Sequence, residues 1–501
     1  MIEDSASPAR LGSRLLRGSS LYLAGNIITK LIGFVMIPFY ARFLSVEEYG
    51  VLNLLELATT ILAISFGLQS VGQSLVRIYH EQTAEAERRA VVSTALFGTM
   101  ALAGLVLVVG VAFARPIGHL LSLDGETNVL RLAFVAMFFS SVAELPLVYL
   151  RMRDRAQVYL AYALVTLVLN LSLNIALIGW MHLGVLGFVY SKLVVSSAGC
   201  VFLLWRTLAE VGSAWHPAIG RALIRFAGPL IVSGGSYFAI HFADRVFLAH
   251  VSRADVGVYS LAYTFAFTLS VLIGDSFNKS WGVSFYSFAS GEGWQNRFVL
   301  VGRWLIFVLG AASIGISLFG RDVLVMMVPP SYVPPFLLLP LLVFGYFLRE
   351  VGDFFNSMLL IGAGSGLVGR IAIAGAALNL VLNAVLIPRF GIWGAAWATF
   401  GTWAAYCAVC WVGAWRLRGV AMPPWPLATI LALSAACLVA KSGGPAGNFV
   451  IRFGLDCVDF AAFLALAAAL YLRPTERADV LRTAARLLAA AGWPRPGHAT
   501  S

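Results

Sequence analysis

Charged residues are scarce in this chain of 501 residues, where they make up 12% of the sequence, against roughly 25% in soluble domains. Hydrophobic residues make up 60%, and the mean hydropathy is +0.85. The long polar inserts that a soluble catalytic domain would require are missing as well. These absences exclude an ordinary soluble enzyme and place almost the whole chain in a lipid bilayer.

The sequence motifs of several enzyme classes are also lacking. The chain contains neither the phosphate loop G-x-x-x-x-G-K-[ST] nor the metalloprotease motif H-E-x-x-H. All five cysteines lie in or beside apolar stretches. We interpret the C-x-x-C formed by Cys407 and Cys410 as small residues that pack between helices. We therefore expect a chain that is not an enzyme, with no catalytic residues, no cofactor and no metal site.

About fourteen long apolar stretches fill the chain between residues 15 and 472. A helix that crosses the hydrocarbon core needs roughly 20 apolar residues. The sequence thus predicts an all-α polytopic membrane protein, with an uncleaved first span in place of a signal peptide. The predicted spans are 18–43, 50–76, 91–114, 129–150, 156–180, 184–206, 219–243, 256–277, 298–320, 336–361, 367–388, 394–415, 426–440 and 449–472.

The distribution of Lys and Arg fits this topology. A net charge of +11 would point to nucleic acid in a soluble protein. When the N-terminus is placed in the cytoplasm, however, 23 of the 35 Lys and Arg residues fall on the inner side, nine fall in outer loops and three lie within spans. This bias is the positive-inside rule. We therefore expect both termini in the cytoplasm and no nucleic-acid partner.

The chain also repeats itself. Residues 45–54 align with 252–261, and residues 169–178 align with 378–387. Each copy holds six predicted spans, so the copies share one orientation, as in duplicated transporters whose substrate site lies between the halves. The predicted divisions are an N-terminal six-helix lobe over 1–212, a second six-helix lobe over 213–418, and two additional transmembrane helices with a basic cytoplasmic tail over 419–501.

Three cations lie within predicted spans, where a lysine at the helix centre costs about 2.5–3.5 kcal/mol. Lys30 shares one helical face with Asn26, and this face is expected to look into a cavity; snorkelling toward the interface is the alternative. Glu56 in span two is expected to face Lys30. Lys192 in span six and Arg349 in span ten are the other two candidates for the cavity.

Asparagines form two matching stripes. Asn170 and Asn174 lie one turn apart in span five, and Asn379 and Asn383 are their counterparts in the second copy. Asparagine side chains hydrogen-bond well between membrane helices, but the same side chains also suit the lining of a polar cavity. Both interpretations remain open, so all four asparagines are candidates for substrate binding.

Intramembrane carboxylates form the last group of candidates. Span ten carries Glu350 and Asp353, and Glu144 lies in span four. Asp353 is one turn from Arg349, and an internal salt bridge would lower the insertion cost without any role in transport. Charges within the membrane are nevertheless functional candidates by default. We therefore take Glu144, Asp353 and Glu350 as candidates for coupling to a proton or sodium gradient.

Three segments carry a family resemblance. They are the first span with Asn26, Lys30 and Pro38, the sequence Phe-Leu-Ser-Val-Glu-Glu-Tyr-Gly at 43–50, and Leu-Asn-x-x-Leu-Asn-x-x-Leu-Ile-Pro-x-x-Gly-x-x-Gly-Ala at 378–395. Together they resemble the Wzx-type oligosaccharide flippases of the multidrug/oligosaccharidyl-lipid/polysaccharide (MOP) exporter superfamily. The resemblance extends from Leu15 to Leu417.

This resemblance implies two six-helix lobes around a central cavity that opens alternately to each side of the bacterial inner membrane. It implies a polyprenyl-diphosphate-linked oligosaccharide as substrate, moved for O-antigen, capsule or exopolysaccharide biosynthesis. The anionic diphosphate would sit near Lys30, Lys192 or Arg349, and the sugar would meet the asparagines. The implied partners are this lipid-linked oligosaccharide, the lipid bilayer, a coupling ion, and polysaccharide polymerase and chain-length proteins.

Two other classes of function remain as alternatives. A multidrug or metabolite antiporter of the same superfamily would need an acidic cavity for a cationic ligand. The three cations and five carboxylates within spans sum to −2 if all are ionised, which departs from the cationic cavities of the flippases. A membrane enzyme such as an O-antigen polymerase is disfavoured by the duplicated halves and the short outer loops.

Overall fold

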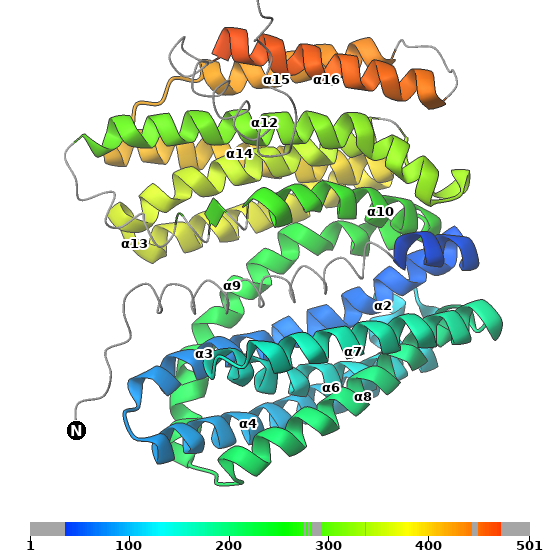
Figure 1. Ribbon diagram of the computed structural model, residues 1–501, viewed down its shortest axis with the longest axis vertical. Coiled ribbons are helices and arrows are strands. Elements are labelled where there is room, and N and C mark those ends of the chain that lie inside the picture. The colour runs from blue at the N-terminus through cyan, green and yellow to red at the C-terminus, as the bar shows by residue number, and fades with distance from the viewer. Residues whose placement is uncertain are drawn as a thin grey trace, which may run out of the picture. The chain divides into compact units, whose positions relative to one another are not determined.

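The computed structural model describes residues 36–274, 277–278, 281, 293–335, 337–442 and 449–471, and all regular elements in these ranges are helices (Figure 1). The first half contains α2 (Val46–Ser65), α3 (Leu68–Glu81), α4 (Glu85–Ala112), α5 (Ala114–Leu120), η1 (Asp124–Glu126), α6 (Thr127–Met152), α7 (Ala156–Asn174), the π-helical η2 (Ile175–Trp180) and α8 (Gly184–Val211). The second half contains α9 (Pro217–Ala249), α10 (Arg253–Leu269), the π-helical η3 (Ser270–Gly274), α12 (Trp294–Met327), η4 (Pro330–Tyr332), α13 (Leu338–Phe390), α14 (Ile392–Arg418), α15 (Trp425–Ser442) and α16 (Phe449–Tyr471).

The apolar helices confirm a polytopic all-α membrane protein. Seven helices among the described residues are long and apolar enough to cross a membrane, and there are eight if α2 and α3 form one bent span. The break between these two helices lies at Gly67, whose φ of 72° is the left-handed conformation that glycine adopts readily. Most of the first predicted span lies outside the described residues, and the number of fourteen spans remains a prediction.

Helix α13 covers two of the predicted spans, 336–361 and 367–388. Helical hydrogen bonding runs from Leu338 to Phe390 without a break, although the segment between the two spans is rich in glycine, which weakens a helix by about 0.5–1 kcal/mol per residue relative to alanine. Within α13, Gly366–Phe390 is by itself long and apolar enough to cross a membrane, in agreement with the predicted span 367–388.

The described chain forms two compact units. Unit 1 comprises the described residues up to Leu261, together with Met327–Pro334 and Ala372–Thr399; unit 2 comprises Ala262–Met326, Pro335–Ile371 and the described residues from Phe400 onward. In unit 1, α6 packs against α4 and α8, and α9 packs against α2 and α3. Figure 1 shows α4, α6, α7 and α8 side by side. Because α9 groups with the first-half helices, these units differ from the two predicted lobes, which remain a prediction.

Two aligned glycines meet within unit 1. A Cβ added to Gly50 would collide with the carbonyl oxygen of Arg253, and one added to Gly257 would collide with that of Val46. Gly257 is the counterpart of Gly50 in the sequence repeat, and Arg253 is the counterpart of Val46. The N-termini of α2 and α10 therefore cross in close backbone contact, and the contact is the same in both directions.

The two helix starts also share their caps. The Oγ of Ser45 accepts a hydrogen bond from the backbone N–H of Glu48 at 3.1 Å, and the Oγ of Ser252 accepts one from the N–H of Asp255 at 3.1 Å. Such caps satisfy backbone donors that have no partner within the helix. The repeat read from the sequence thus recurs in detail at the starts of α2 and α10.

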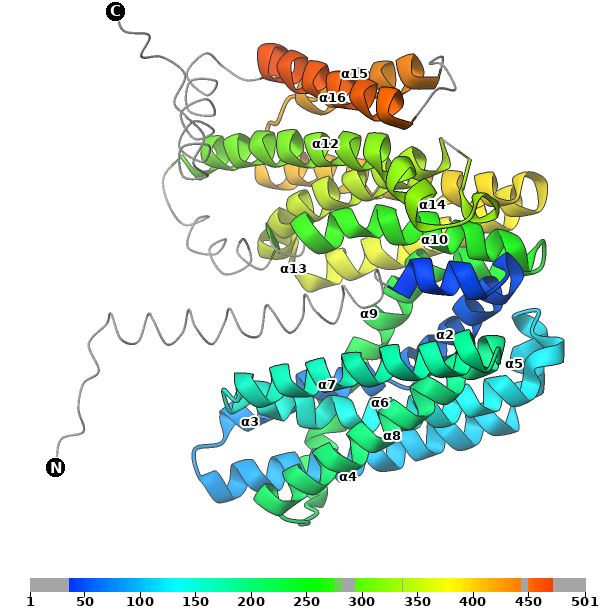
Figure 2. The ribbon, with the colours of Figure 1, turned by 45° about the vertical axis from the view of Figure 1, so that its right-hand side comes forward.

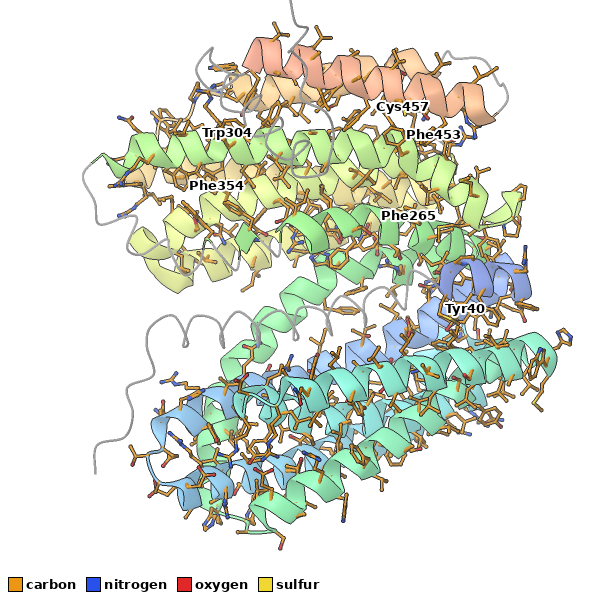
Figure 3. All side chains as sticks on the ribbon, in the orientation of Figure 1. Tyr40, Phe265, Trp304, Phe354, Phe453 and Cys457 are labelled. Atoms are coloured by element: carbon orange, nitrogen blue, oxygen red, sulfur yellow. The ribbon has the colours of Figure 1, made fainter. Side chains whose placement is uncertain are left out.

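The two additional helices of the chain belong to unit 2, where they pack on α12. Figure 2 shows α15 and α16 side by side along this helix. Near one end of α12, Arg303 donates from Nη2 to the carbonyl of Tyr471 at 2.8 Å, and the Tyr471 hydroxyl donates to the carbonyl of Arg303 at 2.6 Å. Farther along α12, Phe319 contacts Phe453 of α16, which is labelled in Figure 3, with ring centroids 5.4 Å apart.

Ion pairs join α12, α15 and α16 near the other end of α12. Arg452 Nη2 lies 2.8 Å from Asp322 Oδ1, and Lys441 Nζ lies 2.7 Å from Asp456 Oδ2. The Lys441 ammonium also donates to the carbonyl of Leu318 at 2.7 Å. Asp322 and Asp456 are both buried. Partnered charges of this kind are the form in which buried carboxylates are tolerated, so α15 and α16 are anchored to α12 at both ends.

Candidate functional site

A cavity of about 770 Å³ lies within unit 1, between α2, α3, α6 and α8. This volume is within the range of roughly 300–1,000 Å³ typical of ligand sites. Small and polar side chains dominate the walls. The polar and charged lining residues are Thr59, Thr60, Gln73, Ser140, Ser141, Glu144, Arg151 and Lys192. Two of the residues predicted from the sequence, Lys192 and Glu144, thus lie in one cavity.

Each cation of this cavity has a carboxylate partner. The Nζ of Lys192 on α8 lies 3.1 Å from Oε1 of Glu56 on α2, and 5.7 Å from the ring centre of Phe188. Arg151 Nη2 lies 3.8 Å from Glu144 Oε1, both residues being on α6. All four charged side chains are at least one third exposed. The cavity is therefore electrically balanced, and both pairs are accessible to a ligand.

The pairing of Lys192 differs from what the sequence suggested. We expected Lys192 to be a single charge at depth and Glu56 to face Lys30. In the structure Glu56 pairs with Lys192, because α2 and α8 lie side by side in unit 1. Lys30 and Asn26 lie outside the described residues.

Span ten forms a second cluster, in unit 2. The Arg349 side chain pairs with Glu350 at 3.3 Å and with Asp353 at 3.6 Å. Arg349 Nη1 also donates to Ser270 Oγ at 3.1 Å, and the Tyr406 hydroxyl donates to Asp353 Oδ1 at 2.6 Å. The salt bridge that the i,i+4 spacing of Arg349 and Asp353 suggested is thus present. Among the residues that the structure describes, this cluster holds two carboxylates and one cation.

Aromatic rings surround the guanidinium of this cluster. The Arg349 guanidinium lies 5.6 Å from the ring centre of Trp403 and 6.0 Å from that of Tyr346. The Glu350 carboxylate is buried over Gly274, where any Cβ would collide with it. Cation–π contacts add to the stability of a desolvated guanidinium. The cluster is a largely buried ion network.

The asparagine stripes bond mainly along their own helices. Asn170 Nδ2 donates to the carbonyl of Thr166 at 3.0 Å, and Asn174 Nδ2 donates to the carbonyl of Asn170 at 2.7 Å. In the second copy, Asn383 Nδ2 donates to Asn379 Oδ1 at 2.9 Å, and both side chains are buried. Each of these bonds occupies one of the two N–H donors of its amide within the same helix, and none of the four asparagines lines the 770 Å³ cavity.

Sequence reasoning missed one buried network in unit 1. Arg245 was assigned to an outer loop, but it lies in α9 and is buried beside Asp244. Its Nε donates to Ser260 Oγ at 3.1 Å and its Nη1 to the carbonyl of His241 at 3.0 Å, while the Tyr259 hydroxyl donates to Asp244 Oδ2 at 2.5 Å. The adjacent letters Asp-Arg, just past an apolar run, are the only sequence signal for this pair.

The cysteines show no metal-site geometry. Cys407 and Cys410 are buried in α14, and both are free thiols. Within the described part of the chain, no three His, Cys, Asp or Glu side chains come together as metal ligands. The packing interpretation of the C-x-x-C agrees with this burial.

Comparison with known proteins identifies the family. Residues 15–281 match the family described as polysaccharide biosynthesis protein. The chain belongs to this family. A protein of the Lsg locus of Haemophilus influenzae is 23% identical over 337 residues, covering 64% of this chain and 78% of the relative. An uncharacterized membrane protein of the same organism is 23% identical over 389 residues, covering 71% of this chain and 90% of the relative.

Solved structures show the same fold. The lipid II flippase MurJ in an inward closed conformation matches with a TM-score of 0.69 and 11% identity. The match covers 91% of this chain and 100% of MurJ. An inward-facing multidrug resistance MATE family transporter of the MOP superfamily also matches, with a TM-score of 0.61 and 14% identity. The match covers 80% of this chain and 95% of that transporter. The fold is that of MOP superfamily transporters, which confirms the resemblance seen in the sequence. The family and fold neighbours are transporters and not enzymes.

Proposed function

We propose that this protein flips a polyprenyl-diphosphate-linked oligosaccharide across the cytoplasmic membrane by alternating access, for surface polysaccharide biosynthesis. The observation that carries the proposal is the unit 1 cavity of a chain in the polysaccharide biosynthesis family, with two cations and a hydroxyl-rich wall. Lysine and arginine form charge-assisted hydrogen bonds to phosphate oxygens. Hydroxyl and amide side chains such as Thr59, Ser140 and Gln73 suit the many hydroxyls of a sugar.

In this proposal Lys192 and Arg151 hold the diphosphate, and the lipid tail remains in the bilayer. Lys30 and Asn26 are further binding candidates from the sequence. Arg349 and the four asparagines have less support as substrate-binding residues. Arg349 is paired with Glu350, and the asparagine stripes contain hydrogen bonds within their own helices. The proposed setting is the bacterial inner membrane with both termini in the cytoplasm, alongside polymerase and chain-length proteins.

Coupling to a proton or sodium gradient is part of the proposal. Glu144 is a carboxylate of the cavity itself. Asp353 and Glu350 belong to the cluster around Arg349 in unit 2. Intramembrane carboxylates are the usual carriers of such coupling.

A multidrug or metabolite antiporter is the second candidate. The MATE-like fold and the two carboxylates beside Arg349 support a cationic ligand. Transport assays with both substrate classes separate the two candidates.

The test is export in a strain that depends on this protein. Lys192→Ala and Lys30→Ala should each reduce surface polysaccharide by about one to two orders of magnitude, because a hydrogen bond to a charged group is worth about 1.5–3 kcal/mol. Lipid-linked oligosaccharide should then accumulate in the inner leaflet. Lys→Arg at either position should retain part of the export. Normal export by both alanine variants at normal protein levels, or drug efflux with no movement of labelled lipid-linked sugar in vesicles, would overturn the proposal.

A further inference from the structure

The ion pair between Lys192 and Glu56 has a feature that an ordinary structural salt bridge lacks. The Lys192 ammonium lines the cavity, and the Glu56 carboxylate on the neighbouring helix α2 lies 3.1 Å from it. The side chains are 36% and 48% exposed, so a ligand that enters the cavity can reach both. Exposed pairs of this kind are weak, and a stronger anion can therefore replace the carboxylate.

We propose that Glu56 is an internal counter-anion, which occupies Lys192 in the empty transporter and is displaced by the diphosphate of the substrate. This inference rests on the proposed function. The carboxylate carries one negative charge, whereas a diphosphate carries at least two and offers more acceptor oxygens. Glu56 thus raises the threshold for binding at Lys192, and a diphosphate has the charge and the acceptor oxygens to pass it.

The two ion pairs of the cavity differ in whether they join two helices. Glu144 and Arg151 both belong to α6, so breaking that pair leaves the helices joined as before. Lys192 and Glu56 connect α8 to α2, 136 residues apart in the chain. Displacement of Glu56 removes a link between two walls of the cavity, and it couples occupancy of the site to the contact between these helices.

The experiment measures binding to the purified full-length protein in detergent. The probes are farnesyl diphosphate and farnesyl monophosphate, which share a tail and differ in anionic charge. The variants are Glu56→Gln, Lys192→Ala and the double variant. Glu81→Gln is the matched control, because it removes the same charge from an exposed pair with Arg77 that lies outside the cavity lining.

Glu56→Gln should tighten binding of the diphosphate by about two- to fivefold, the amount expected for loss of a competing exposed ion pair. It should tighten binding of the monophosphate by a similar factor, because the same competing carboxylate is removed for both ligands. Lys192→Ala should weaken the diphosphate by about tenfold or more. In the Lys192→Ala background, Glu56→Gln should have little effect, because the ammonium that it frees is gone. Glu81→Gln should bind as the unmodified protein does.

Each contrary outcome has a distinct meaning. Equal tightening by Glu56→Gln with and without Lys192 would reveal a general charge effect and overturn the displacement idea. No change in affinity with Glu56→Gln, while Lys192→Ala weakens binding, would overturn it and leave the proposed function standing. Unchanged binding by Lys192→Ala would remove the cation from the proposed function itself. If Glu56→Gln fails to fold, Glu56→Asp, which draws the carboxylate back by one methylene, should show the same tightening to a smaller degree.

Discussion

Gly50 and Gly257 occupy equivalent places in the sequence repeat, and each one faces the other copy's helix start across a backbone contact too close for any side chain. Reciprocal contacts of this type are the signature of a two-fold relationship between the partners. Here the relationship lies within one chain, between the starts of α2 and α10. The duplicated sequence thus has glycine on both sides of this contact.

The glycine contact yields the first prediction. Gly50→Ala should lower the free energy of unfolding by about 1–3 kcal/mol, the usual cost of overpacking, because its Cβ would strike the carbonyl of Arg253. Gly104→Ala in α4 is the control, since no atom lies within 4 Å of the added Cβ. There the change should be neutral or favourable by up to about 1 kcal/mol. Thermal unfolding of purified variants measures both, and a Gly50→Ala protein as stable as the control would contradict the prediction.

A second prediction concerns coupling. Replacing Glu144 by Gln or Asp353 by Asn should make transport insensitive to the ion gradient at normal protein levels, because the exchangeable carboxylate is lost. Tyr406→Phe is a matched variant, since it removes the 2.6 Å hydrogen bond to Asp353 but keeps the carboxylate, and it should retain gradient dependence. Uptake into vesicles with and without imposed gradients gives the measurement. If both carboxylate variants respond to the gradient as before, the two residues are structural.

The third prediction tests the topology. In a variant without the five native cysteines, single cysteines at Gln82 and Ser213 should react from the cytoplasmic side, and one at Ser122 from the outside. These positions follow the positive-inside count of 23 against nine. Labelling of intact cells with a membrane-impermeant thiol reagent supplies the measurement. Reaction of Gln82 and Ser122 from the same side would refute the predicted arrangement of spans.

The fourth prediction concerns the anchoring of α15 and α16. Lys441→Ala should destabilise the protein by about 3–5 kcal/mol, since it leaves a buried carboxylate without its charge partner, here Asp456. Arg77→Ala, which breaks the exposed pair with Glu81, should cost no more than about 1 kcal/mol. Thermal unfolding in detergent compares the two. Equal stability of both variants would show that the ion network does not hold these helices.

The sequence predicted local relationships well. The salt bridge between Arg349 and Asp353 follows from a spacing of one helical turn. The all-α membrane fold followed from apolar length, and the family followed from the resemblance of particular segments to known flippases. These features depend on residues close in sequence, whose geometry the helix itself fixes.

Relationships between distant residues were beyond reach of the sequence. Nothing in the apolar pattern joins Lys192 to Glu56, because that pair depends on which helices are neighbours. Arg245 was placed in a loop because hydropathy falls at Asp244, although the helix continues and buries both charges as a pair. The asparagine stripes were ambiguous for a similar reason, since these amides bond along their own helix.

The anchoring of α15 and α16 limits how this protein can be shortened. Removing the two helices would leave the carboxylate of Asp322 and the guanidinium of Arg303 without the partners that now cover them, and both would face hydrocarbon or detergent on the flank of α12. The rest of the chain therefore cannot be recovered by deletion alone. It would first need apolar residues at these two positions, because α15, α16 and the surface of α12 beneath them depend on one another.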